Sequence, residues 1–101
     1  MLESVNGFDW DAGNREKCRK HGVELADIET LFRGSIAIHP ARFGGKEERF
    51  VAISRTADER NVLIVFTLRR RGEKLLIRPI SARYMHQREV EHYEKATKAQ
   101  N

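Results

Sequence analysis

The sequence predicts an α+β fold with two N-terminal helices, a four-stranded and mainly antiparallel sheet, and a C-terminal helix. Apolar residues recur at helical spacing in the first third of the chain, short β-rich runs fill the middle, and helical spacing returns near the end. The 101 residues, 40% of them hydrophobic, are enough for one modest core. We therefore predict a single domain over residues 1–101, with an ordered core over about residues 8–96.

The first helix is predicted from the residues at its two ends. A short extended entry over residues 8–10 leads to Asp11, whose carboxylate can cap a helix by accepting from backbone N–H groups near Asn14. The helix is expected over about residues 12–21. Gly22 then suits the left-handed residue that commonly follows a helix.

A second helix is predicted over about residues 24–33. Leu25, Ile28 and Phe32 share one face of it at helical spacing, and Gly34 ends it. This apolar face is expected to cover one side of the sheet.

Four β-rich runs follow, at residues 36–38, 50–54, 62–68 and 74–81. The third run is apolar on both faces, as a central strand would be. The short connection over 71–73 predicts a hairpin, and Pro79 favours an edge or a bulge in the fourth run. A last helix is expected over about 85–96, with Val90 and Tyr93 facing inward.

Positive charge is concentrated in one part of the chain. The whole chain has 19 Lys and Arg against 15 Asp and Glu, which is a net charge of +4. Residues 69–88 contain seven cations and one acid, a balance of 7 − 1 = +6; the cations are Arg69, Arg70, Arg71, Lys74, Arg78, Arg83 and Arg88. Because arginine binds phosphate oxygens two at a time, this window favours a polyanionic partner. The triplet 69–71 alone is better explained as a solvated hairpin tip.

Several classes of protein are disfavoured by the same composition. The longest apolar run, residues 62–66, is far shorter than the roughly 20 residues of a membrane-spanning helix. The first residues lack the pattern of a secretory signal, so we expect a cytoplasmic protein without a membrane partner. A lone Cys18 and four scattered His give no spacing for structural zinc, and we expect no metal and no cofactor.

Candidate phosphate-binding cations lie on the last strand and on the first helix. Arg78 occupies a strand position where the alternation asks for an apolar residue. It either binds a ligand, or lies at an edge where it covers the sheet or pairs with a carboxylate. Arg83 at the strand end would complete a phosphate clamp. Lys17 and His21, four residues apart, contribute to a polyanion site or form a solvated helix end.

The last helix offers candidate proton-transfer groups. His86, Glu89 and Tyr93 share one face of it, near Arg83 if this helix lies against the strand. Taken singly, Glu89 is also explained as a carboxylate that favours a helix N-terminus, and Tyr93 as part of the core.

Four blocks of the sequence, in the same order, resemble the BrnT-type toxins of bacterial type II toxin–antitoxin pairs. The blocks are Phe8-Asp9-Trp10-Asp11 with Gly13-Asn14, Lys17 and Lys20-His21-Gly22-Val23; Glu48-Arg49-Phe50-Val51-Ala52-Ile53; Val65-Phe66-Thr67-Leu68-Arg69 with Arg78-Pro79-Ile80-Ser81-Ala82-Arg83; and Arg88-Glu89 with Glu91-His92-Tyr93-Glu94. The resemblance covers about residues 8–94. Many members have a Lys where this chain has Asn14, and Lys17 is expected to take over its role.

The resemblance implies a RelE-like fold and a ribonuclease that inhibits translation and growth by cutting RNA. It also implies a BrnA-like antitoxin with a ribbon-helix-helix part, through which alone the complex binds operator DNA. RNA needs no metal to be cut, because its own 2′-hydroxyl can attack the adjacent phosphorus. The enzyme must help to remove the hydroxyl proton, stabilise the added negative charge and protonate the leaving oxygen.

We hypothesise that Arg78 and Arg83 hold the scissile phosphate, with Arg69 assisting. Glu89, His86 or His21 would transfer protons, in an order that the sequence leaves open. Further RNA contacts are expected from residues that are mostly basic: Lys17, His21, Arg70, Arg71, Lys74, Arg88 and Tyr93. The alternative function is a non-catalytic module that binds nucleic acid or a protein partner through the same basic surface.

Overall fold

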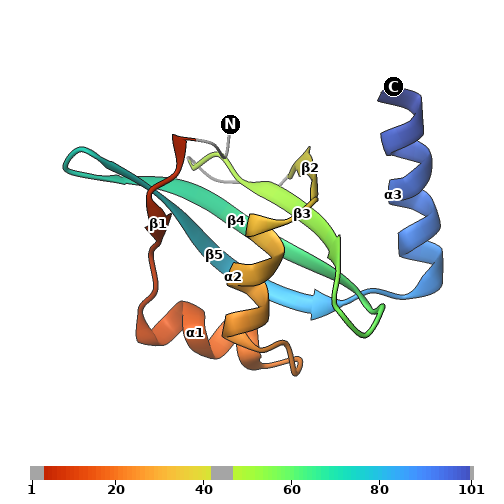
Figure 1. The fold of residues 1–101 in the computed structure, drawn as a ribbon, viewed down its shortest axis with the longest axis horizontal. Coiled ribbons are helices and arrows are strands. Elements are labelled where there is room, and N and C mark those ends of the chain that lie inside the picture. The colour runs from red at the N-terminus through yellow and green to blue at the C-terminus, as the bar shows by residue number, and fades with distance from the viewer. Residues whose placement is uncertain (1–3, 42–46, 101) are drawn as a thin grey trace.

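The computed structural model describes residues 4–41 and 47–100, with side chains up to Lys95. The described chain forms β1 (Gly7–Phe8), α1 (Ala12–Arg19), α2 (Leu25–Arg33), β2 (Ala37–Pro40), β3 (Phe50–Arg55), β4 (Asn61–Arg71), β5 (Lys74–Tyr84) and α3 (Gln87–Gln100). Helices and strands are combined as the sequence predicts, so the α+β class is confirmed (Figure 1).

The sheet has five strands in the described part of the chain, in the order β1-β5-β4-β3-β2. The prediction of four strands is therefore wrong, and a strand rather than a helix comes first. β1 runs parallel to β5, with Gly7 opposite Leu76 and Phe8 opposite Ile77, whereas the other pairs are antiparallel. A two-residue strand is too short to show an alternating pattern, and it forms because its backbone pairs with a strand that is distant in the sequence.

Both ends of α1 follow the predicted pattern. Asp11 accepts from the Asn14 backbone N–H at 2.9 Å, and the Asn14 side chain accepts from the Asp11 N–H at 2.7 Å. This reciprocal pair is a capping box. The helix ends at Arg19, two residues before the predicted end, and Gly22 has a φ of 87° in the turn that follows. Residues 20–22 thus redirect the chain toward α2.

The β4–β5 hairpin is longer than predicted, and it contains a bulge. Its turn is at Gly72, which has a φ of 62°, and pairing extends from there to Val62 opposite Tyr84. The register shifts between Val65 and Phe66, since Val65 lies opposite Ser81 and Phe66 opposite Pro79. Pro79 therefore lies at a β-bulge, which is one of the two positions, an edge or a bulge, that the sequence predicts for this proline.

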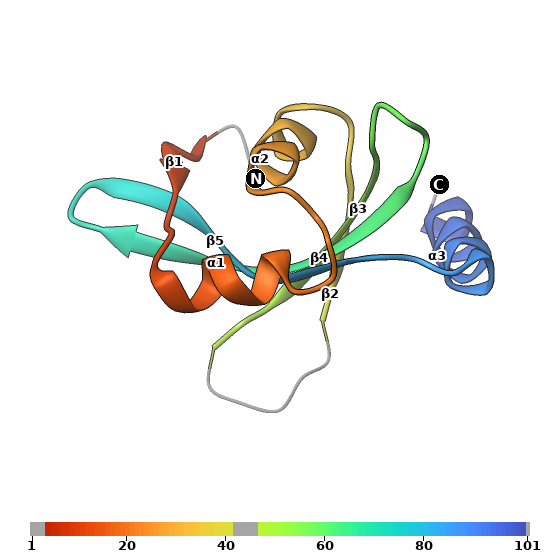
Figure 2. The same ribbon diagram turned by 90° about the horizontal axis from the view of Figure 1, so that it is seen from below.

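The core lies on both faces of β4, which is the middle strand as predicted. On one face, α1 and α2 cover a cluster that includes Cys18, Ile28, Phe32, Val62, Ile64 and Phe66. On the other face, Val51, Leu63 and Val65 form a smaller cluster, against which Tyr93 of α3 packs. Figure 2 shows α1 beside β5 and α3 standing apart from the other two helices. No helix within residues 4–41 and 47–100 is long and apolar enough to cross a membrane.

Candidate functional site

A pocket of about 360 Å³ lies where the N-terminal end of α1 meets β4, β5 and the segment that leads into β3. Its lining combines four cations with two carboxylates, a net charge of 4 − 2 = +2. The residues are Asp11, Gly13, Asn14, Lys17, Glu47, Arg49, Arg69, Arg78, Pro79 and Ile80. Such an excess of fixed positive charge in a hollow favours the binding of an anion. We call it the arginine pocket.

Arg78 is held in the arginine pocket by two carboxylates. Its Nη2 donates to Asp11 Oδ2 at 2.6 Å, and its Nη1 lies 3.6 Å from Asp9 Oδ2. The side chain is only 18% exposed. Of the alternatives that the sequence leaves open, pairing with a carboxylate is confirmed. The Asn14 backbone N–H, and next the Arg78 guanidinium, lower the pKa of Asp11, so this carboxylate remains ionised beside the arginine.

Arg69 enters the same pocket from the neighbouring strand. In the β4–β5 register it lies opposite Leu76, while Thr67 lies opposite Arg78, so Arg69 and Arg78 share a face of adjacent strands. Arg69 Nε donates to Glu47 Oε1 at 2.7 Å, and this contact lowers the pKa of Glu47. The structure thus brings together two of the three arginines that the sequence assigns to phosphate.

Sequence reasoning missed Glu47 and Arg49 as members of the pocket. They precede β3, and Thr67 fixes this segment by donating its hydroxyl to the Glu48 carbonyl at 2.6 Å. Phe50 lies opposite Phe66, so the same antiparallel register continued backward places residue 47 beside Arg69. Glu47 and Arg69 lie just outside the predicted strands 50–54 and 62–68, and a Glu facing an Arg in the extended register was the available signal.

Arg83, Glu89 and His86 form a separate cluster at the start of α3. Arg83 donates from Nη1 and Nη2 to the two carboxylate oxygens of Glu89, both at 2.7 Å, and the His86 N–H donates to Glu89 Oε1 at 3.2 Å. Arg83 lies opposite Leu63 and Arg78 opposite Thr67. Four residues of β4 separate these positions, about 13 Å at roughly 3.3 Å per residue. The two arginines of the predicted clamp therefore contact different carboxylates.

Arg83 lowers the pKa of Glu89 to about 2. A carboxyl whose pKa falls on folding stabilises the protein above its unfolded pKa, and this stabilisation is lost as the pH falls toward the folded pKa. We therefore expect the free energy of unfolding to fall between about pH 5 and pH 2. Because Arg83 is 42% exposed, the pair contributes no more than about 1 kcal/mol.

Urea unfolding of the wild type and Glu89→Gln at pH 7 and pH 3 measures this contribution. The wild type should lose more stability than Glu89→Gln on acidification. Equal losses in the two proteins would show that the pair contributes nothing.

The other predicted RNA contacts lie at several places. Lys17 lines the arginine pocket, His21 is exposed after α1, and Arg88 is exposed on α3. Arg70, Arg71 and Lys74 lie at the exposed end of the β4–β5 hairpin, where Arg71 contacts Asp9 at 3.1 Å. Asp9 thereby links this end of the hairpin to Arg78.

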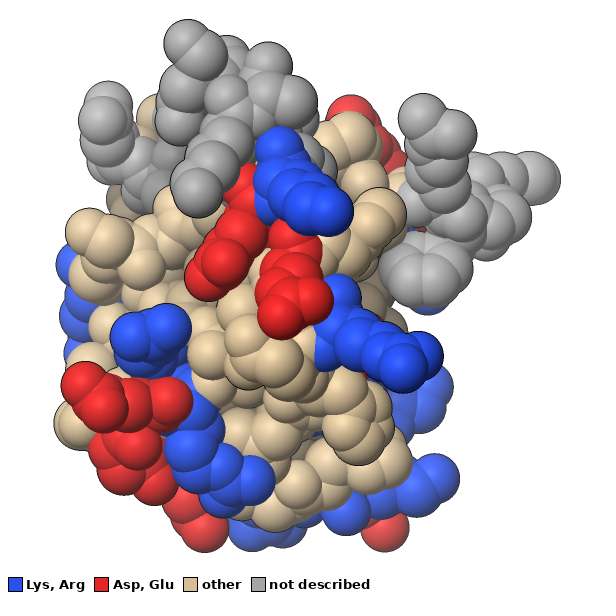
Figure 3. Space-filling model, turned by 90° about the vertical axis from the view of Figure 1, so that its right-hand side faces the viewer, with Lys and Arg blue, Asp and Glu red and all other residues tan. Residues whose placement is uncertain are grey.

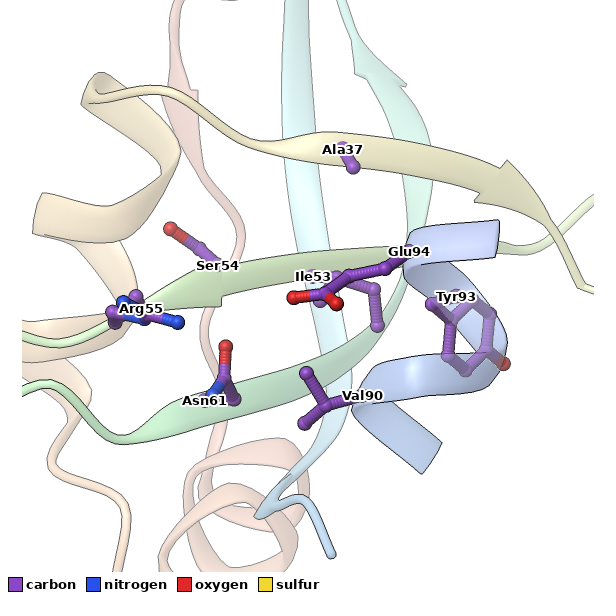
Figure 4. A pocket seen from close by; sticks show the side chains of 8 residues that line it. All are labelled: Ala37, Ile53, Ser54, Arg55, Asn61, Val90, Tyr93 and Glu94. Carbon is purple, nitrogen blue, oxygen red and sulfur yellow. The ribbon is translucent and has the colours of Figure 1, made fainter. Parts of the chain in front are cut away.

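Tyr93 lies apart from the arginine pocket. Its ring centroid is 5.1 Å from that of His39, and the side chain packs on the smaller core cluster. Val90, Tyr93 and Glu94 also line an apolar groove of about 490 Å³ between α3 and the strands (Figure 4). These contacts support the core role that the sequence offers for Tyr93.

One side of the molecule carries mixed charge (Figure 3), and the thiol of Cys18 is not activated. On the side viewed in Figure 3, acidic and basic side chains are interspersed. Burial raises the pKa of Cys18 to about 11, so its thiol is not an activated nucleophile. In the part of the chain that the structure describes, no group of three or more His, Cys, Asp or Glu side chains could hold a metal ion.

Comparison with known families gives one match. A family model described as the ribonuclease toxin BrnT of type II toxin–antitoxin systems matches residues 10–89. This range includes Asp11, the whole arginine pocket and the Arg83–Glu89 pair. Among curated proteins, none matches the chain.

Proposed function

The chain belongs to the BrnT family of ribonuclease toxins of type II toxin–antitoxin systems, and we propose that its arginine pocket is where RNA is bound and cut. The single observation that carries this proposal is that Arg69 and Arg78 lie on the same face of adjacent strands, and that each is held by a carboxylate. Guanidinium groups fixed in this way can stabilise the negative charge that develops on a phosphate under attack.

Asp11 and Glu47 show how the pocket arginines bind anionic oxygens. Each accepts a short hydrogen bond from a pocket arginine, at 2.6 Å and 2.7 Å. A phosphodiester of the RNA backbone carries the same single negative charge and likewise presents two terminal acceptor oxygens. We propose that the scissile phosphate replaces Glu47 as the partner of Arg69 while Asp11 continues to hold Arg78, and that Lys17 and Arg49 contact the flanking backbone. The predicted contact of Arg83 would then fall on a neighbouring phosphate along β5.

Proton transfer would fall to a group outside the Arg83–Glu89 pair. A general base works best when its pKa is near the working pH, and Glu89, with a pKa of about 2, is a weak base while it stays paired. Of the three candidates from the sequence, this leaves His86 and His21, neither of which is among the residues that line the arginine pocket. Removing each histidine in turn separates the two.

We further propose that a BrnA-like ribbon-helix-helix antitoxin neutralises the chain in the cytoplasm, and that the complex contacts operator DNA only through the antitoxin. Membership in a type II family supports a protein antitoxin. The net positive charge of the arginine pocket suits an acidic antitoxin segment that would mask it.

Cleavage in the absence of metal is the direct test. The purified chain, freed of any partner and incubated with RNA in EDTA, is expected to give fragments that end in a 2′,3′-cyclic phosphate. Arg33→Ala is a suitable control, because Arg33 is exposed on α2 and contacts only Glu29 among the salt bridges of the described chain.

Two other outcomes of this assay would change the proposal. Intact RNA bound in a salt-sensitive way would indicate the alternative, a module that binds nucleic acid without cutting it. Fragments that disappear when EDTA is added would exclude the metal-independent mechanism.

A further inference from the structure

We infer that Asn14 is a positioning residue, which sets the orientation of Arg78 for catalysis. The inference rests on the proposed function of the arginine pocket. Asn14 belongs to α1 and is 5% exposed, one of the three buried polar or charged residues in the described chain. A buried amide needs partners for its hydrogen-bonding groups, and those of Asn14 belong to two segments, the stretch before α1 and β5.

The side chain of Asn14 joins α1 to the edge of the sheet. Its Nδ2 donates to the Asp9 carbonyl at 2.9 Å and to the Pro79 carbonyl at 2.8 Å, 65 residues away in the sequence. Its Oδ1 accepts from the Asp11 N–H at 2.7 Å. Both donor hydrogens and the carbonyl oxygen of the amide are thus used, and each bond fixes backbone rather than another mobile side chain.

Two of these contacts lead directly to Arg78. Pro79 follows Arg78 in the chain and lies at the bulge, so its carbonyl fixes the backbone from which the arginine side chain projects. Asp11 belongs to the capping box with Asn14, and its second carboxylate oxygen accepts from Arg78 Nη2. The backbone and the guanidinium of Arg78 are therefore both set through Asn14.

The hydrogen-bonding groups around Asn14 in this chain suit an amide. The two carbonyls of Asp9 and Pro79 need donors, while the Asp11 N–H needs an acceptor. A carboxylate in this place would supply no donor and would lie beside Asp11. An ammonium group would supply no acceptor. Asparagine meets all three demands with a short side chain.

A double-mutant cycle in RNA cleavage tests the inference. Asn14→Ala is expected to lower kcat roughly 10- to 100-fold, because a small displacement of a catalytic group is costly for the rate. In an Arg78→Ala background the same substitution should change kcat by less than about 2-fold, because the residue through which it acts is gone. An equal loss in both backgrounds would overturn the inference. If Asn14→Ala does not fold, Asn14→Asp removes the same donors with little change in size.

Cys18→Ala is the matched control for destabilisation. Cys18 is fully buried on the same helix and contacts the core rather than the arginine pocket. At a temperature where all variants are folded, it should cleave RNA at the wild-type rate. A loss as large as that of Asn14→Ala would assign the effect to helix stability and overturn the inference. Arg78→Ala with wild-type activity would instead overturn the proposed function of the pocket.

Discussion

Arg78→Ala is expected to lower kcat for RNA cleavage roughly 10²- to 10³-fold while the protein stays folded. The charge of Arg78 is oriented before substrate arrives, because Asp9 and Asp11 hold its two Nη atoms. A charge fixed in this way stabilises the transition state without reorganisation during the reaction. Steady-state cleavage of a defined RNA, with circular dichroism to check folding, measures the effect.

Two comparison variants sharpen this result. Arg78→Lys keeps the charge but loses the planar fork, so it should recover only part of the lost rate. Arg83→Ala tests the second arginine that the sequence selects, and it should also lose cleavage if that residue contacts the RNA. Arg33→Ala should retain activity, since it removes an exposed arginine on α2. Wild-type cleavage by Arg78→Ala would refute the assignment of the arginine pocket.

Phe66→Ala is expected to destabilise the fold by about 3–5 kcal/mol. Phe66 is fully buried at the middle of the sheet, with ring centroids 5.0 Å from Phe32 of α2 and 5.4 Å from Phe50 of β3. The substitution removes these ring contacts and leaves a cavity that rigid neighbours cannot fill. A domain of this size has a total stability of about 5–15 kcal/mol, so the variant should lose much of it.

Urea unfolding at neutral pH, followed by fluorescence and circular dichroism, measures this loss. Phe66→Leu retains most of the apolar volume and should lose much less stability. A loss below about 1 kcal/mol for Phe66→Ala would show that α2 and the sheet repack around the cavity.

The helices, the hairpin and the central strand could be predicted because their signals are local. Asp11 marks the start of α1, and Gly22 marks the turn that follows it. The apolar residues on both faces of 62–68 identify a strand that is covered on both sides. β1 could not be predicted in this way. Its two residues have no period, and they become a strand only through pairing with Leu76 and Ile77 of β5.

The sequence predicts which types of residue form the site better than it predicts which of them lie together. The excess of arginine around Arg78 indicates phosphate, and the structure places Arg69 beside it. That Arg83 turns to Glu89 instead depends on where α3 begins, which is a tertiary contact. Glu47 and Arg49 enter the arginine pocket from an irregular segment, whose path no periodicity describes.

The bulge at Pro79 also decides which arginines can face the same way. Side chains alternate along a strand, so residues separated by an odd number, as Arg78 and Arg83 are, would normally project from opposite faces. Without the shift at Val65 and Phe66, Arg78 would lie opposite Leu68 and point into the core beneath the helices. One inserted residue reverses this parity, and both arginines project from the sheet face on which their partners Leu63 and Thr67 lie. The bulge, rather than either arginine alone, therefore places two positive charges on one surface.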